Sequence, residues 1–114
     1  MSLHAEYTNV EGCARYVSRL TREMGVGMQI HISETRAEHE ECIARHGMTP
    51  TRLLEECGVL ELPVTAAHCV YVSDDDIALM ARELIKHKKI LSKHLQKKIC
   101  MLYYLYEIFN DCSI

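Results

Sequence analysis

The sequence lacks several features of secreted, membrane and disulfide-rich proteins. None of its six cysteines belongs to a Cys-x-x-Cys pair, and no apolar run approaches the roughly 20 residues that a transmembrane helix needs. Residues 99–109 form the most apolar stretch, which is short and contains Glu107. Residues 1–8 are polar and do not resemble a signal peptide. We therefore expect a cytoplasmic protein with reduced thiols and no membrane contact.

Lysine is absent from residues 1–85, and arginine is absent from residues 86–114. The first part carries seven arginines and fourteen acidic residues, a net charge of −7, whereas the tail carries six lysines and two acidic residues, a net charge of +4. Either cation serves on a solvated surface, so the switch indicates two segments of different origin that join near residues 84–87. The lysines could contact nucleic acid, but the acidic remainder opposes this, and we expect a solvated helix face.

The 114 residues, 48% of them hydrophobic, suffice for one domain with a core. Hydrophobic spacing and capping signals predict, in order, a helix at 10–24, a strand at 28–32, helices at 35–46 and 49–57, a strand at 63–69 and a helix at 73–84. The first helix is expected to open on a capping box at Thr8 and Glu11, and the last on Ser73 with three acids at the positive end of its dipole. Strands separated by helices form parallel sheets. Because two or three parallel strands are not self-sufficient, we expect part of a larger α/β barrel or doubly wound fold.

Residues 85–109 have the spacing of one amphipathic helix, and residues 101–106, MLYYLY, are apolar on nearly all sides. Such a helix would expose a large apolar surface if it were alone. We therefore predict a homo-oligomer that associates through exposed strand edges and this tail. A frameshift or a rearranged gene would explain both the tail and the switch from arginine to lysine.

Polar side chains stand where the two predicted strands end. His31 and Glu34 follow the first strand, and His68 ends the second. The carboxyl ends of parallel strands carry the active sites of α/β enzymes, and a neutral imidazole with a nearby carboxylate suits a divalent metal and its water. Hydrogen-bonded core histidines are the alternative. We interpret the acids at 38–41 as a solvated helix face and His39 as solvent-exposed.

Four segments together resemble one known family. They are HAEYT at 4–8, QIHISET at 29–35 with Glu38 after it, GMTPTRLLEECGVL at 47–60, and AAHCV at 66–70 followed by DDDI at 74–77. In order and spacing they are similar to motifs of the amidohydrolase superfamily, and more narrowly of the methylthioadenosine/S-adenosylhomocysteine deaminases and the triazine and guanine-type aminohydrolases. The resemblance covers about residues 3–84. It implies a partial (β/α) barrel from the end of strand 4 to helix 6, in residues 1–85, followed by an unrelated, lysine-rich amphipathic helical tail in residues 86–114.

The resemblance also implies a role for each matched residue. His31 would ligate zinc or iron, and Glu34 would carry a proton from the metal-bound water to the ring nitrogen or leaving amine. His68 would orient the attacking hydroxide, and His4 would contact the substrate. The family reaction is hydrolytic deamination or dechlorination of a purine-nucleoside-like or triazine-like ring, so a small heterocyclic amine is the expected substrate.

The chain departs from the family pattern in its metal ligands. The family takes two ligands from a His-x-His pair and one from an aspartate ending the eighth strand, and this chain contains no His-x-His. Because catalytic zinc sites use at least three protein ligands, we expect no tight metal binding and no activity by the chain alone. The alternative is a non-catalytic oligomerising module from a truncated or frameshifted gene.

Overall fold

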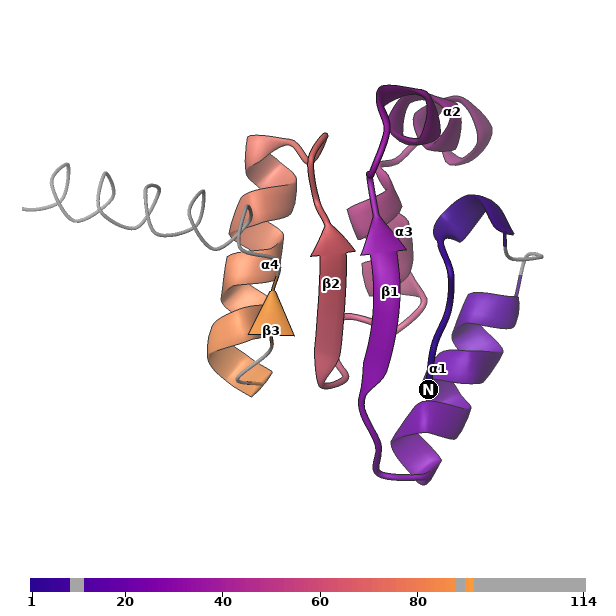
Figure 1. Ribbon diagram of the computed structural model, residues 1–114, viewed down its shortest axis with the longest axis vertical. Helices are drawn as coiled ribbons and strands as arrows, with labels where there is room; N and C mark the ends of the chain where they lie inside the picture. Colours follow the sequence, from indigo (N-terminus) through magenta and orange to yellow (C-terminus); the bar gives the residue numbers. More distant parts are fainter. Residues whose placement is uncertain (9–11, 88–89, 92–114) are drawn as a thin grey trace, which may run out of the picture.

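The computed structural model describes residues 1–8, 12–87 and 90–91 (Figure 1). Helices and strands follow one another in the order η1 (Glu6–Thr8), α1 (Cys13–Glu23), β1 (Met28–Ile32), α2 (Arg36–His46), α3 (Pro50–Glu56), β2 (Val64–His68), α4 (Asp74–His87) and β3 (Ile90–Leu91). Within these described ranges, no helix combines the length and the apolar character that crossing a membrane requires.

The strands form a parallel sheet in the order β1-β2-β3. Residues 1–4 extend it on the free side of β1, because Gln29 donates to the Met1 carbonyl (3.0 Å) and Leu3 donates back to Gln29 (3.0 Å). The His31 amide likewise donates to the His4 carbonyl (2.9 Å). Four parallel segments therefore lie side by side in chain order, which confirms the predicted parallel α/β arrangement and is compatible with part of an α/β barrel.

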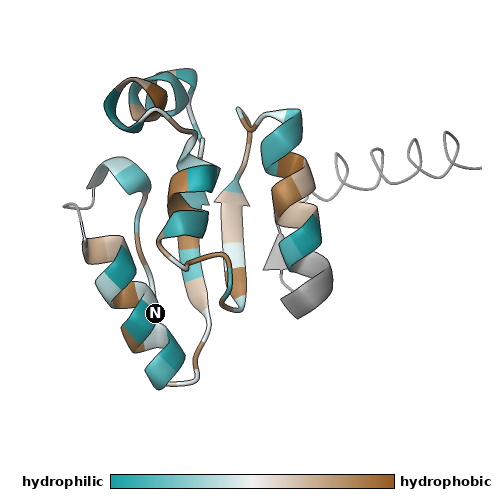
Figure 2. Cartoon of the chain, turned by 180° about the vertical axis from the view of Figure 1, so that it is seen from behind, coloured by the Kyte–Doolittle hydropathy of each residue, from teal (hydrophilic) through white to brown (hydrophobic). Residues whose placement is uncertain are grey.

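The core occupies one face of this sheet. Along β1, Met28, Ile30 and Ile32 are buried, whereas Gln29 between them is exposed. The helices α3 and α4 lie behind the sheet in Figure 1 and in front of it in Figure 2. Their apolar side chains join those of the strands in one cluster that consists of Leu3, Met28, Ile30, Ile32, Leu54, Val59, Leu62, Val64, Ala66, Cys69, Val72, Ile77, Met80 and Ala81. One face of the sheet is thus covered by helices, as on the outside of a barrel.

Local capping chemistry determines where α2 and α3 begin. The Thr35 hydroxyl caps α2 and Glu38 completes the reciprocal capping box, while Thr49 caps α3 ahead of Pro50. These two starts confirm the prediction. The predicted capping box at Thr8 is wrong, because its hydroxyl donates to the Ala5 carbonyl (3.0 Å) and α1 begins only after a left-handed Gly12.

The segment after α4 differs from the predicted helix. Ile90 and Leu91 form a strand paired in parallel with Thr65 and Ala66 of β2, so the prediction of a continuous helix from 85 to 109 is wrong at these two positions. Periodicity in a short apolar run cannot separate a helix from a buried strand, and only the adjacent backbone edge of β2 decides between them. Residues 92–114 lie outside the described ranges, so the helical tail and the boundary at residues 85 and 86 stay predictions.

Candidate metal and catalytic site

The backbone leaves the extended conformation where β1 and β2 end. Ser33 has a φ of 47°, His68 of 63° and Cys69 of 54°, and no other non-glycine residue in the described part of the chain has a positive φ. This left-handed conformation costs an ordinary residue about 1 kcal/mol or more, and such residues gather at functional sites because the surrounding structure has to impose them. All three lie at the carboxyl edge of the sheet.

The left-handed turn accompanies an unusual direction of the His68 side chain. Strict alternation along β2 would place His68 on the helix-covered face with Val64 and Ala66. The centroid of its ring instead lies 4.7 Å from the centroid of the His31 ring, and the two rings are nearly perpendicular. His31 belongs to the second face of the sheet, because the neighbouring Ile30 and Ile32 point into the core. The turn thus brings side chains of two strands together.

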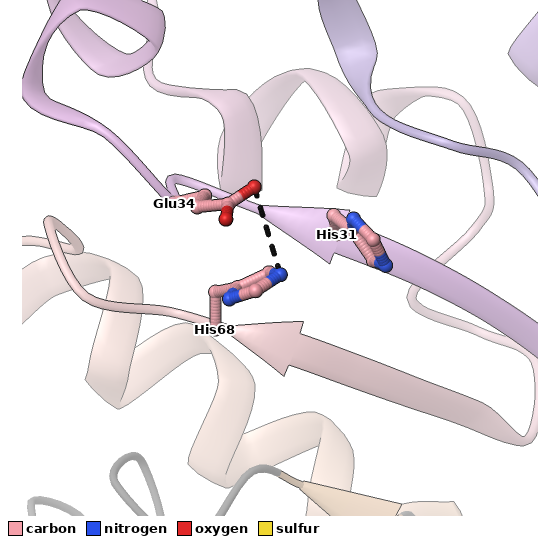
Figure 3. Close-up of side chains that lie close together, drawn as sticks. All are labelled: His31, Glu34 and His68. Carbon is pink, nitrogen blue, oxygen red and sulfur yellow. Dashed lines mark ion pairs between the residues drawn. The ribbon is translucent and has the colours of Figure 1, made fainter.

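His31, Glu34 and His68 form one cluster of potential ligand atoms (Figure 3). One ligand atom of each residue lies within 4.8 Å of the others, and the Glu34 Oε2 atom is 3.6 Å from His68 Nε2. His31 is half-buried, and its Nδ1 atom is buried without a hydrogen-bond partner among the residues that the structure describes. A buried imidazole nitrogen that lacks a partner is unusual, because burial without one costs free energy.

His4 completes the edge from the amino-terminal segment. The centroids of the His4 and His31 rings are 5.0 Å apart, and the Nε2 atom of His4 is 3.3 Å from the Tyr7 hydroxyl. Both His4 and Tyr7 are exposed. All four residues singled out from the sequence therefore meet at one edge, although their individual roles stay predictions. Tyr7 was quoted only as part of the HAEYT segment and given no role, and its place in η1, three residues after His4, was the available signal.

The loop that carries Glu34 is held by a buried acid. Glu38 is 6% exposed, and its carboxylate accepts the amides of Ser33 (3.0 Å), Glu34 (2.8 Å) and Thr35 (3.4 Å). The Ser33 hydroxyl lies 3.0 Å from Nδ1 of His39. The interpretation of Glu38 as a solvated acid is therefore wrong, and His39 is half-buried rather than fully exposed. The Thr-x-x-Glu spacing at 35–38 was the signal that could have revealed Glu38.

A second buried acid ties η1 to α2. Glu6 is 7% exposed, and both of its carboxylate oxygens accept hydrogen bonds from Arg45. Cys42 lies on the same side of α2 and is fully buried. Burial, and secondarily the nearby Glu6 carboxylate, raises the pKa of the Cys42 thiol to about 12. Cys42 is consequently a neutral thiol under physiological conditions and is unsuited to nucleophilic or metal-binding chemistry.

Parallel strands that carry imidazole and carboxylate groups at their carboxyl edge are typical of α/β enzymes with sites for metal-assisted hydrolysis. The model of the amidohydrolase family matches residues 1–102. The chain belongs to the amidohydrolase family. The match runs beyond residue 84, where the resemblance of the motifs ends.

Curated relatives match over 79 to 98 residues. The 5-methylthioadenosine/S-adenosylhomocysteine deaminase of Thermoanaerobacter pseudethanolicus is 40% identical over 87 residues, which are 76% of this chain and 19% of the relative. That of Desulforudis audaxviator is 44% identical over 79 residues, 69% of this chain and 18% of the relative. The 5'-deoxyadenosine deaminase of Methanopyrus kandleri is 38% identical over 98 residues, 84% and 23%. The chain thus spans about a fifth of the length of these relatives.

Two solved structures share the fold. An adenosine deaminase from Xanthomonas campestris with bound zinc superposes with a TM-score of 0.67 and 24% identity, over 72% of this chain and 19% of that chain. A guanine deaminase from C. acetobutylicum superposes with a TM-score of 0.59 and 22% identity, over 62% and 18%. At these identities the likeness concerns the fold alone, and it extends over about a fifth of each of the two solved chains.

Proposed function

We propose that this chain forms one sector of the active site of a metal-dependent aminohydrolase that removes an amine from a purine-nucleoside-like ring. The observation that carries this proposal is the meeting of His31, Glu34 and His68 within 4.8 Å at the carboxyl edge of a parallel sheet. The relatives named above are deaminases of adenosine-type compounds, which supports hydrolytic deamination. The proposal also includes a triazine-like ring as substrate, from which hydrolysis would remove an amine or a chloride.

The residues fit a divalent metal. The buried Nδ1 atom of His31 has no partner in the described structure, and imidazole and carboxylate donors are those that zinc and iron accept. His31 would hold the metal, which when bound supplies a Lewis acid and lowers the pKa of a water molecule. Because the family's other ligands, the His-x-His pair and the aspartate, have no counterparts here, we infer that the chain alone holds zinc or iron weakly.

The remaining residues would bind, orient and transfer protons. The Glu34 side chain is 46% exposed and lies at the edge of the site, so its carboxylate can take a proton from water and deliver it to the ring nitrogen or the leaving amine. His68, with Nε2 at 3.6 Å from that carboxylate, would orient the attacking water. His4 would contact the substrate from the neighbouring segment, with its ring 5.0 Å from His31.

A chimera tests the proposed sector directly. Residues 3–84 of this chain replace the corresponding segment of the Thermoanaerobacter pseudethanolicus deaminase, and ammonia release from 5'-methylthioadenosine is measured. We expect a folded chimera to turn over substrate and Glu34→Gln in it to abolish turnover, while Glu40→Gln, an exposed acid on α2, has no effect. A folded, metal-loaded chimera without activity would refute the proposed sector.

The 114-residue chain by itself is expected to be inactive. Added zinc should produce no ammonia from adenosine, because one histidine from the family's ligand set cannot hold a catalytic metal tightly. Robust turnover by the isolated chain that disappears in Glu34→Gln would overturn this expectation.

The second candidate is a non-catalytic module that associates with copies of itself. Copies would associate through exposed strand edges and through the apolar tail around residues 101–106, which lies outside the described residues. Light scattering tests this candidate: a dimer or larger oligomer is expected at micromolar concentration, and a stable monomer would count against association through the strand edges and the tail.

A further inference from the structure

We propose that Glu38 is a positioning residue that holds the loop of Glu34 so that the Glu34 carboxylate stays beside His68. This inference rests on the proposed function of the site, in which Glu34 transfers the proton. Glu38 belongs to α2, is 6% exposed and lies beneath the loop at residues 33–35. It is thus placed to act on Glu34 through the backbone rather than on a substrate.

The shortest hydrogen bonds of Glu38 are to backbone amides that precede the cap residue of α2. In a capping box, the acid at the third helical position bonds to the amide of the cap residue, here Thr35, and this distance is 3.4 Å. The amides of Ser33 and Glu34, which precede the cap, are closer, at 3.0 and 2.8 Å. A role in starting α2 accounts for the Thr35 contact but not for these two shorter bonds.

The backbone conformation explains why a carboxylate is needed at this place. The left-handed φ of 47° at Ser33 turns successive amides toward one side of the chain, which creates a concave group of N–H donors suited to an anion. Glu38 supplies that anion from within the protein, and its two oxygens share the donors. The same contacts stabilise a conformation that Ser33 would otherwise adopt at a cost.

The loop is also fixed from the other side. The Ser33 carbonyl accepts the amides of Val70 (3.2 Å) and Tyr71 (3.1 Å), which follow His68. The loops after β1 and β2 are therefore joined through the Ser33 carbonyl, while the Ser33 amide donates to the Glu38 carboxylate. Because the Glu34 side chain extends from the next residue, the position of its carboxylate at 3.6 Å from His68 depends on this arrangement.

The test compares Glu38→Gln with Thr35→Ala in the metal-free chain by NMR. Both variants damage the cap of α2, because Thr35→Ala removes the hydroxyl that accepts the Glu38 amide. Only Glu38→Gln removes a carboxylate oxygen from Ser33 or Glu34. We expect exchange at the amide that loses its acceptor oxygen, that of Ser33 or of Glu34, to accelerate about tenfold in Glu38→Gln, the effect of losing a hydrogen bond of this kind. Exchange at both amides should stay near wild type in Thr35→Ala. We also expect loss of the nuclear Overhauser contact between the Glu34 side chain and the His68 ring in Glu38→Gln alone.

A cobalt titration adds a reading at the site itself. Glu34 offers one of the three potential ligand atoms of the cluster, and groups that hold a ligand in place typically contribute about 10- to 100-fold in metal affinity. Glu38→Gln should therefore weaken Co²⁺ binding by the isolated chain about tenfold and alter its visible spectrum, whereas Thr35→Ala should not. Should Glu38→Gln fail to fold, Glu38→Asp, which keeps the charge but shortens the reach, is measured in the same way.

Equal exchange rates and an unchanged Glu34–His68 contact in the two variants would overturn the positioning role of Glu38. Faster exchange with the Glu34–His68 contact retained would also overturn it, since the loop would then be held without placing Glu34. The two NMR measurements need no metal and no substrate. An inactive chimera or a chain that binds no cobalt therefore bears on the proposed function alone, and the positioning role is still decided.

Discussion

Asp76 provides a sharp test of how α4 is anchored beside the site. The three acids at 74–76 could all act through the helix dipole, but the structure gives Asp76 a separate role. It is fully buried, and its carboxylate accepts the Ser73 amide (3.0 Å), the Ser73 hydroxyl (2.8 Å) and the Thr49 hydroxyl (2.5 Å). Asp75 in the same turn is exposed. Asp76 thus joins the first turn of α4 to the cap of α3.

The expected magnitude follows from these contacts. Asp76→Asn keeps the size of the side chain but turns one acceptor oxygen into a donor, so one or two charge-assisted bonds are lost. Each of these bonds is worth about 1.5–3 kcal/mol. Because Ser73 is exposed and Thr49 is half-buried, water can replace part of the lost hydrogen bonding. We expect the free energy of unfolding to fall by about 2–3 kcal/mol. Asp75→Asn should cost only about 0.3–1 kcal/mol, the effect of an exposed charge at a helix start.

Urea unfolding followed by circular dichroism at 222 nm measures both variants under identical conditions. The midpoint for Asp76→Asn should drop by about 1–2 M, given the usual dependence of stability on urea for small proteins. If the free energy of unfolding fell equally in the two variants, within about 0.5 kcal/mol, the helix dipole alone would account for the stabilising effect of the acids at 74–76. The hydrogen bonds of Asp76 would then contribute nothing measurable to the junction.

Two further predictions concern the core. Because the pKa of Cys42 rises from 9.0 to about 12 on folding, the folded state retains its proton in this range while the unfolded state loses it, so stability is full below pH 9 and decreases between pH 9 and about 12. Urea unfolding at pH 8 and pH 10 should show this decrease, with a smaller one in Cys42→Ala; the slope is not abolished, since burial raises the pKa of Cys57 in the same direction. Equal slopes would contradict the assignment. Separately, Ile30→Val should lower the free energy of unfolding by about 0.5–1.5 kcal/mol and Gln29→Ala by less than about 0.5 kcal/mol, because Ile30 is fully buried and Gln29 is exposed. If urea unfolding showed the larger loss for Gln29→Ala, the second face of the sheet would contribute more to stability than the core face.

Local chemistry made much of the secondary structure predictable. Thr35 and Thr49 are caps whose side chains satisfy the first free amides of α2 and α3, and Gly47 ends α2 in a left-handed conformation. These signals act within one helical turn, so neighbouring residues suffice to read them. The start of α1 was misplaced because Thr8 bonds back to Ala5 instead of forward into a helix. At Ile90–Leu91 the strand depends on the distant edge of β2, which no local pattern contains.

The candidate site divides in the same way. The alternation of strands and helices in the sequence was enough to put His31, Glu34 and His68 at the ends of parallel strands. The place of His4 at a strand end came only from the resemblance of residues 4–8 to the family motif. That these side chains meet depends on tertiary packing, namely on the register of β1 with β2 and on the left-handed turn at His68. Tertiary packing also decided that Glu38 is a buried anchor rather than a solvated acid. The physical reason is that burial and hydrogen-bond partners depend on how separate segments pack, whereas helix caps and strand periodicity depend on neighbours along the chain.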